Sequence, residues 1–316
     1  MAILILRRLV QMALIIVVAS FLLFLIFDTD AFKKKTAIAE LGGFGVSSLS
    51  EADYQKWLDE KGLNVPFYQR YGKWLGDVAT GDLGRSYEKS TAVGPLLLDR
   101  LKNTGILAFW VFALMIPLSL VTGVLAGMRE GSAQDRTLSF IAVFTTSIPE
   151  IATAILLTVI FALGLGWLPA KSAMIGGFNW RQLVLPVLTL VIYDFGYVAR
   201  MTRASMAEVM TSQYIRTAVL KGLPFRHVIV KHALRNALIA PFTIIVLQLN
   251  WLLSGVVVVE VFFEYDGFGK LLLEAALFGD IYVVQACTLV AVVIAVLSQI
   301  ISDVGYTILN PRIRFA

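Results

Sequence analysis

The sequence has few charged residues, one cysteine and two histidines. Only 16% of its 316 residues are Asp, Glu, Lys or Arg, whereas 58% are hydrophobic and the mean hydropathy is +0.78. About a quarter of the residues of a soluble globular domain are charged, so this composition excludes that class. The single Cys287 excludes an intramolecular disulfide and a metal site built from several thiolates.

The motifs of common enzyme classes are also missing. The chain has no Gly-x-Ser-x-Gly elbow, no His-Glu-x-x-His pair and no nucleotide-binding Gly-Lys-Ser/Thr loop. Its two histidines, His227 and His232, are five residues apart, a spacing that predicts different faces of an α-helix. We therefore expect no catalytic residue, no metal and no cofactor bound by this chain, and any energy source must lie on another chain.

Long apolar runs dominate the sequence instead. Six of them are uncharged or nearly so and long enough to span a hydrocarbon core of about 30 Å: residues 9–27, 105–128, 137–167, 183–199, 237–259 and 281–302. Helices satisfy their own backbone hydrogen bonds in lipid, so the sequence predicts an all-α membrane protein with six transmembrane helices. A cleaved signal peptide is the alternative for the first run, but the run is long and no small-residue cleavage site follows it.

The basic residues of the short connecting segments predict the orientation. With six spans, they gather on one side: Arg7, Arg8, Arg129, Arg136, seven residues of the central loop, Arg312 and Arg314. Basic short loops stay in the cytoplasm, so both termini and the central loop are expected there. Residues 28–102 carry eleven acidic and eleven basic residues, and long segments cross largely regardless of charge.

These patterns predict three parts. Residues 1–27 form a cytoplasmic N-terminus and the first span, residues 28–104 an extracytoplasmic segment, and residues 105–316 a transmembrane core with a cytoplasmic loop at 200–238. Within the outer segment, we expect a helix at 50–58 that begins at a serine, an aromatic-rich stretch at 66–78 and a turn at 81–86.

The most informative stretch is a basic island at residues 199–241, between two apolar runs. It holds seven Lys or Arg residues, one acid and both histidines. A helical run at 205–219 is followed by Gly222 and Pro224, the order expected at a helix end, and a second run extends from Arg226 towards Pro241. One interpretation is a helix that docks into a groove on a partner. The other is a loop that only sets topology and touches anionic lipid.

Several motifs in this island resemble one family. Tyr214-Ile215-Arg216-Thr217-Ala218, Lys221-Gly222-Leu223 and His232-Ala233-Leu234-Arg235-Asn236-Ala237 are similar to the cytoplasmic loop of the dipeptide/oligopeptide/nickel permeases of ABC importers. The resemblance continues at residues 6–9, 81–86, 260–269 and 310–314. It departs at residues 28–31, where the family usually has Pro-Gly-Asp-Pro, and at Asp266, where it often has proline.

The resemblance implies a permease subunit of an ATP-driven, binding-protein-dependent importer with the type I importer fold, in a bacterial or archaeal cytoplasmic membrane. The partners implied are a second homologous permease, two ATPase subunits that bind ATP and Mg²⁺, and an extracytoplasmic solute-binding protein. The residues implied in ATPase coupling are Tyr214, Arg216, Thr217, Ala218, Lys221 and Gly222. Di- or oligopeptides are the expected substrate, with nickel complexes, glutathione, opines or oligosaccharides as alternatives.

Two other function classes are compatible with a chain of this composition. An ion-coupled secondary transporter could use the acids within the apolar runs, but it predicts inverted repeats, and we find none. A membrane scaffold without transport activity is the second alternative.

Three polar residues within the apolar runs are candidates for a translocation path: Glu150, Asp194 and Asn250. A charge at mid-bilayer costs about 2.5–3.5 kcal/mol on insertion scales, so the two acids should face protein or water. They either attract a cationic group of the substrate or pair with a neighbouring polar residue in a structural role. The family usually has uncharged residues at both acidic positions, so the resemblance does not decide between these roles.

Proline and glycine within the runs suit a bundle that bends and packs closely. The prolines that interrupt the spans are Pro117, Pro149, Pro186 and Pro241. The glycines expected to permit close helix packing are Gly123, Gly127, Gly164 and Gly166.

Overall fold

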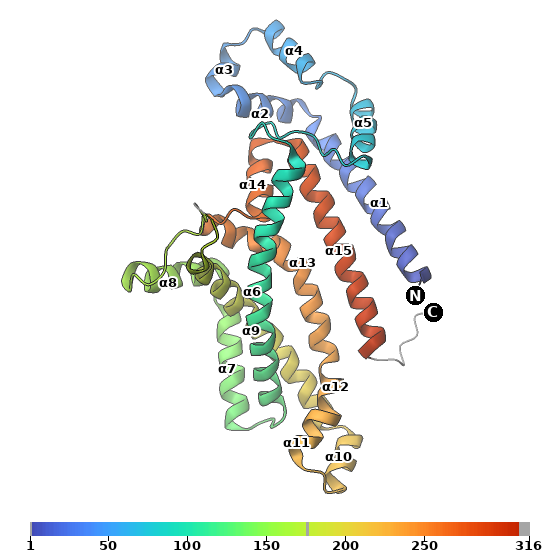
Figure 1. Ribbon diagram of the computed structural model, residues 1–316, viewed down its shortest axis with the longest axis vertical. Helices are drawn as coiled ribbons and strands as arrows, with labels where there is room; N and C mark the ends of the chain where they lie inside the picture. The colour runs from blue at the N-terminus through green and yellow to red at the C-terminus, as the bar shows by residue number, and fades with distance from the viewer. Residues whose placement is uncertain (1, 175–176, 310–316) are drawn as a thin grey trace. The chain divides into compact units, whose positions relative to one another are not determined.

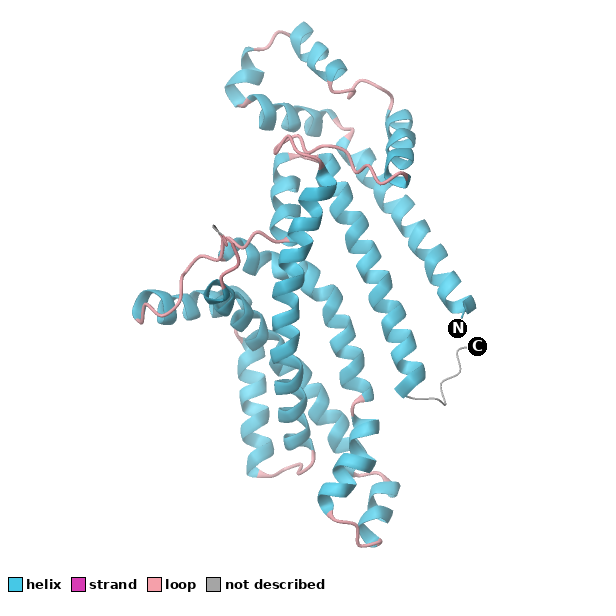
Figure 2. Cartoon of the chain, viewed as in Figure 1, coloured by secondary structure: helices cyan, strands magenta, loops and turns pink. Residues whose placement is uncertain are grey.

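The computed structural model describes residues 2–174 and 177–309, except for the side chains of residues 2–5, 39, 43, 249–255, 303 and 306–309 (Figure 1). Every regular element in this described part is a helix, as Figure 2 shows, and extended pairing is limited to one isolated bridge between Arg85 and Ala92. The prediction of an all-α protein is therefore confirmed.

The helices follow one another along the chain with short connections. In order they are α1 (Ala2–Phe27), α2 (Asp30–Leu41), α3 (Gly43–Ser48), α4 (Glu51–Glu60), α5 (Phe67–Ala79), α6 (Val93–Gly127), α7 (Ala133–Ser147), α8 (Glu150–Leu157), the π-helix η1 (Thr158–Gly164), α9 (Trp180–Met210), α10 (Gln213–Leu220), α11 (Phe225–His227), the π-helix η2 (Val228–Ala233), α12 (Leu234–Ala237), α13 (Ile239–Phe262), α14 (Phe268–Phe278) and α15 (Ile281–Leu309).

Four helices in the described part are long and apolar enough to cross a membrane: 6–27, Val93–Gly127, Trp180–Met210 and Ile281–Ser302. Two bent helix pairs raise this number to six if each pair is one span. They are Ala133–Ser147 with Glu150–Gly164, bent by 97°, and Phe225–Ala237 with Ile239–Gln248, bent by 49°. The third predicted span, 137–167, is thus not a continuous helix, whereas α13 covers the fifth, 237–259, from Ile239 onward.

The sharper bend has a local cause in the backbone. Ile148 is extended, with φ −88° and ψ 124°, and it precedes Pro149, which is itself the N-cap of α8. The proline ring disfavours the helical conformation of the residue before it, so the helix stops there. Pro149 therefore separates two helices, whereas Pro117 and Pro186 lie inside α6 and α9.

The chain divides into two compact units, which we describe separately. Unit 1 comprises residues 1–104 and 267–296, and unit 2 comprises residues 105–266 and 297–316.

Unit 1 contains the short helix predicted for residues 50–58, and the aromatic-rich stretch at 66–78 is helical as well. Ser50 is the N-cap of α4, and its hydroxyl accepts a hydrogen bond from the Asp53 amide at 3.2 Å. The aromatic stretch forms α5, on which Trp74 is buried against Phe24 of α1 and Ile281 of α15. The short helices have a second apolar cluster around Trp57 and Leu58.

Unit 2 is organised around α9, against which α7, α8 and α13 pack. Two close approaches to α9 are at glycines of α6: a side-chain Cβ at Gly123 would lie 2.5 Å from the Ala199 carbonyl oxygen, and one at Gly127 would lie 2.5 Å from the Arg203 carbonyl oxygen. These two glycines permit close packing, as predicted. Gly164 and Gly166 were expected to do the same, but a Cβ at either would meet no other helix among the described residues of this chain.

Candidate functional site

The segment predicted to couple to an ATPase, residues 200–238, comprises the end of α9 and then the short helices α10, α11, η2 and α12. The expected helical run at 205–219 is wrong in one respect: α9 ends at Met210 and α10 begins at Gln213. The Thr211 hydroxyl donates to the Glu208 carbonyl oxygen at 2.7 Å, and the Ser212 hydroxyl donates to the Val209 carbonyl oxygen at 2.6 Å. Such side-chain to backbone bonds compete with the helical ladder, which explains the break.

The end of α10 has the predicted glycine turn. Gly222 has φ +75°, in the left-handed region. Its amide donates to the Val219 carbonyl oxygen at 2.9 Å, and the Leu223 amide donates to the Ala218 carbonyl oxygen at 3.4 Å. This pair of bonds is the Schellman motif, in which glycine is favoured because other residues are strained at positive φ.

One face of α10 is buried and the other is exposed. Ile215 and Ala218 pack with Met206, Val228 and Ile229 in an apolar cluster. The remaining predicted coupling residues are exposed: Tyr214, Arg216, Thr217, Lys221 and Gly222. Ala218 therefore anchors the helix within unit 2. The other five residues are accessible to solvent or to a partner protein.

Apolar side chains on the same surface are exposed as well. Leu220 is 79% exposed, Val219 52% and Tyr214 42%. The Tyr214 hydroxyl also accepts a hydrogen bond from the Asn236 side-chain amide at 2.8 Å, which ties α10 to α12. A helix that presents apolar and basic side chains on one surface, and is held from behind by a buried cluster, is suited to docking into a groove.

The two histidines lie closer together than their spacing predicted. The rings of His227 and His232 have centroids 5.7 Å apart, because the chain between them is the π-helix η2. A π-helix stacks residues five apart, whereas an α-helix does not. The prediction that they occupy different faces is therefore wrong. In the described part of the chain, however, no group of three or more His, Cys, Asp or Glu residues could hold a metal ion.

Asp194, a predicted path residue, is buried in the middle of α9 with 2% of its surface exposed. One carboxylate oxygen, Oδ1, accepts a hydrogen bond from the side-chain amide of Gln248 on α13 at 2.7 Å. The other oxygen, Oδ2, has no hydrogen-bond partner among the described residues. A buried carboxylate with one free oxygen retains the capacity to accept a further donor.

Glu150, the second predicted acid, is the first residue of α8, just after Pro149. It is half-buried, and its Oε1 has no hydrogen-bond partner in the described structure. Its carboxyl group lies within electrostatic range of Asp194. The third candidate, Asn250, has a side chain outside the described residues.

A cavity of about 300 Å³ opens at Asp194, and we call it the Asp194 cavity. Its walls also include Gln248 and the guanidinium-bearing side chain of Arg200, two turns further along α9. Thr146, Tyr193 and Tyr197 complete the lining. The cavity thus offers an anionic, a cationic and an amide group around one space, a combination suited to a ligand that carries both charges.

Sequence reasoning missed three of the residues that shape this region. Gln248 and Arg200 line the Asp194 cavity, and Asp135 forms a two-bond ion pair with Arg203, at 2.8 Å for each bond. Gln248 could have been found from the sequence, because it is a polar residue within an apolar run. Nothing in the spacing of residues 135 and 203 predicts that pair, because it joins α7 to α9 across 68 positions.

Comparison with known proteins identifies the family. The family model described as the inner membrane component of binding-protein-dependent transport systems matches residues 119–315. This chain belongs to that family. It is a multi-pass membrane protein and a permease subunit of such a transport system.

Curated relatives match over most of their own length. An oligopeptide transport system permease protein, AppB of Bacillus subtilis, is 35% identical over 274 residues, which cover 84% of this chain and 87% of the relative. A dipeptide permease, DppB of Alkalihalophilus pseudofirmus, is 34% identical, and the match covers 85% of its length. A glutathione permease, GsiC of Escherichia coli, is 34% identical, and the match covers 82% of its length.

Proposed function

We propose that this chain imports di- or oligopeptides as one of two homologous permeases in an ATP-driven importer. The observation that carries the proposal is the similarity to permeases named for oligopeptides, dipeptides or peptides, at 34–37% identity over about four fifths of the chain. The glutathione permease fits the same chemistry, because glutathione is itself a small peptide. Membership in a binding-protein-dependent family disfavours both an ion-coupled transporter and a scaffold.

The Asp194 cavity supports a peptide as cargo. The free oxygen of Asp194 would receive the peptide ammonium group, with the charge of Glu150 close by. Arg200, on the same cavity, would receive the carboxylate. Opposite charges at two points of a concave site fix the orientation of a zwitterionic ligand. The competing role for Asp194 is a structural hydrogen bond with Gln248 alone.

Energy for transport would enter through α10 and its glycine turn. In this proposal, Tyr214, Arg216, Thr217 and Lys221 contact an ATPase subunit, while Ala218 and the Gly222 turn hold the helix in place. ATP and Mg²⁺ would be bound by two such ATPase subunits, and a solute-binding protein would deliver the peptide on the opposite side of the membrane.

The proposed topology has six spans, with residues 1–27, 28–104 and 105–316 as the three parts predicted from the sequence. The bent pair Ala133–Ser147 with Glu150–Gly164 counts as one span, and α13 (Ile239–Phe262) counts as another. Both termini and residues 200–238 are cytoplasmic by the basic-residue rule, and residues 28–104 are outside. A cysteine introduced at Ser212 should then react with an impermeant thiol reagent only from the cytoplasm, and one at Ser48 only from outside. Reaction of both from one side contradicts this topology.

Reconstitution tests the transport function. The chain, its permease partner, the ATPases and the binding protein are assembled in liposomes, and uptake of labelled dialanine and trialanine is measured. We expect uptake that requires ATP, the binding protein and this chain. ATP-dependent uptake of nickel complexes or oligosaccharides with no uptake of either peptide would contradict the proposal.

A further inference from the structure

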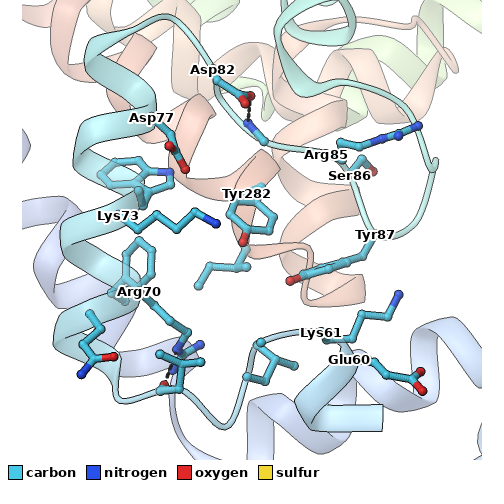
Figure 3. Close-up of a pocket in the computed structure, with 18 of the residues that line it drawn as sticks. Glu60, Lys61, Arg70, Lys73, Asp77, Asp82, Arg85, Ser86, Tyr87 and Tyr282 are labelled. Atoms are coloured by element: carbon cyan, nitrogen blue, oxygen red, sulfur yellow. Dashed lines mark hydrogen bonds between the residues drawn. The ribbon is translucent and has the colours of Figure 1, made fainter.

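Unit 1 contains a larger cavity than the Asp194 cavity, and nothing in the transport scheme above uses it. Its volume is about 710 Å³, within the range of roughly 300–1,000 Å³ typical of small-molecule sites. It is enclosed by residues of α4, α5, the turn-rich stretch 81–90 and the start of α15, as Figure 3 shows. We call it the unit 1 cavity.

Most basic side chains on its walls are already committed. Arg70 forms an ion pair with Asp28, Lys61 forms one with Glu40 at 2.5 Å, and the Arg85 guanidinium donates to the Ser90 carbonyl oxygen at 3.0 Å. Lys73 is different: it forms no hydrogen bond or ion pair within the described structure, and Figure 3 shows it pointing into the cavity. One ammonium group therefore remains for a ligand.

The acidic side chains show the same division. Glu40 forms the ion pair with Lys61, and Asp82 accepts a hydrogen bond from the Gly84 amide at 2.8 Å. Asp77 and Glu60 form no side-chain hydrogen bond or ion pair among the described residues, and of these two Asp77 lies one turn from Lys73 on α5. The two uncommitted charges on α5 are therefore of opposite sign and border the same space (Figure 3).

Aromatic rings line the remainder of the cavity. The rings of Tyr87 and Tyr282 lie 5.4 Å apart, and Trp74 is buried beside them. Burial and the neighbouring Tyr282 raise the pKa of the Tyr87 phenol above its ordinary value, so it stays protonated and can donate a hydrogen bond. The walls thus combine two opposite charges, hydroxyl groups and apolar rings.

This combination restricts the class of ligand. Four acidic side chains around the cavity disfavour a polyanion, and four basic ones disfavour a polycation. The volume exceeds that of the Asp194 cavity more than twofold, so more than a single amino acid can enter. A short peptide with free termini carries one positive charge, one negative charge and an apolar or amide body between them.

We infer that the unit 1 cavity is a second peptide-binding site, in which Lys73 receives the carboxylate and Asp77 the ammonium group of a short zwitterionic peptide. The inference rests on the proposed function only for the source of the peptide, which would be the transported cargo. A phosphatidylethanolamine headgroup has the same pair of charges and is the other source that the experiment must separate.

The test uses the full chain in nanodiscs of phosphatidylcholine, without binding protein or nucleotide. Binding of trialanine is measured by calorimetry and compared with N-acetyl-trialanine amide, which has neither terminal charge. We expect trialanine to bind, the capped peptide to bind about tenfold more weakly or not at all, and Lys73→Met and Asp77→Asn each to weaken trialanine about tenfold. Lys73→Arg should retain binding.

Matched controls keep the result specific. Lys56→Met removes an exposed lysine of α4 that does not border the cavity, and it should leave binding unchanged. Elution of each variant as a single species shows that it is folded. Equal trialanine binding by wild type and Lys73→Met overturns the inference. So does peptide binding that appears in phosphatidylcholine but is abolished by phosphatidylethanolamine, because a lipid headgroup is then the preferred occupant.

Failure of the inference and failure of the proposed function are distinguishable. ATP-dependent peptide uptake with no Lys73-dependent binding leaves the proposed function standing and overturns the second site. Binding at the unit 1 cavity with no uptake of peptide by the complete importer overturns the proposed function and leaves the second site standing.

Discussion

The two cavities of this permease are built from similar groups in different ways. The unit 1 cavity has its charges on short helices and turns, where Glu40, Lys61 and Arg70 are in half-buried ion pairs. The Asp194 cavity has one carboxylate that is 2% exposed, on a long helix packed on several sides. Exposed pairs contribute little to stability, whereas a buried carboxylate depends on every partner it has. Substitutions should therefore be tolerated in unit 1 and costly in unit 2.

The largest expected difference between the two units is at glycine positions. A Cβ at Gly196 would collide with the Ala142 carbonyl oxygen and lie 2.5 Å from the Thr145 hydroxyl, whereas a Cβ at Gly76 on α5 meets nothing within 4 Å. We expect Gly196→Ala to abolish the yield of folded protein, because α7 and α9 are forced apart. Gly76→Ala should raise the thermal midpoint slightly, since alanine favours a helix by about 1 kcal/mol over glycine.

Equal yields and midpoints for these two variants, measured after purification in detergent, would contradict the packing of α7 against α9. They would also contradict the expectation that substitutions are tolerated in unit 1 and costly in unit 2.

The next largest effect is expected at the end of α10. A Cβ at Gly222 meets nothing within 4 Å, so any penalty there comes from its φ of +75°. Valine is strained in that conformation, while asparagine adopts it more readily. We expect Gly222→Val to insert normally but to lose substrate-stimulated ATP hydrolysis in the assembled importer, and Gly222→Asn to retain most of it. Stimulation unchanged in the valine variant would show that this turn does not transmit the coupling.

Asp194 allows its path role and its structural role to be separated. Asp194→Asn keeps the shape and removes only the charge. If the carboxylate receives a cationic group, uptake of peptides with basic side chains should fall roughly ten- to hundredfold, the equivalent of one hydrogen bond to a charged group of about 1.5–3 kcal/mol, and uptake of neutral peptides should fall less.

A purely structural Asp194 predicts a different result, namely a lower yield of the complex and equal losses for all peptides. Unchanged yield together with unchanged uptake of every peptide would contradict both roles. The matched substitution in unit 1, Asp77→Asn, should leave the yield unchanged because its carboxylate is not fully buried.

The smallest effect concerns pH. Burial and Tyr282 raise the folded-state pKa of Tyr87 above its unfolded value of about 10. The folded protein therefore holds this proton more tightly, so the stability from this group is present below about pH 10 and is lost as the pH rises towards the folded pKa. Between about pH 9 and pH 11, the thermal midpoint of Tyr87→Phe should fall less than that of the wild type, and that of the exposed Tyr68→Phe should fall equally.

Much of the fold followed from local patterns, and the exceptions have physical causes. The N-cap at Ser50 and the turn at Gly222 are decided within a few residues, and both were predicted. The breaks at Ile148 and Thr211 are also local, but neither was predicted: the first lies in an apolar run that suits a straight or a bent helix, and the second lies among good helix formers of the basic island. The histidine pair was predicted wrongly because a π-helix depends on the fit of neighbouring helices, which periodicity does not contain.

The sequence by itself determined that this is a helical membrane protein of the binding-protein-dependent permease family, because apolar run length, basic-residue placement and the motifs at 214–237 are properties of the chain alone. Only the tertiary structure decided which side chains share a space. Gln248, which donates to Asp194, and Arg203, which donates to Asp135, lie on other helices, and Lys73 has no partner among the described residues. Contacts between such distant positions arise from packing, not from spacing along the chain.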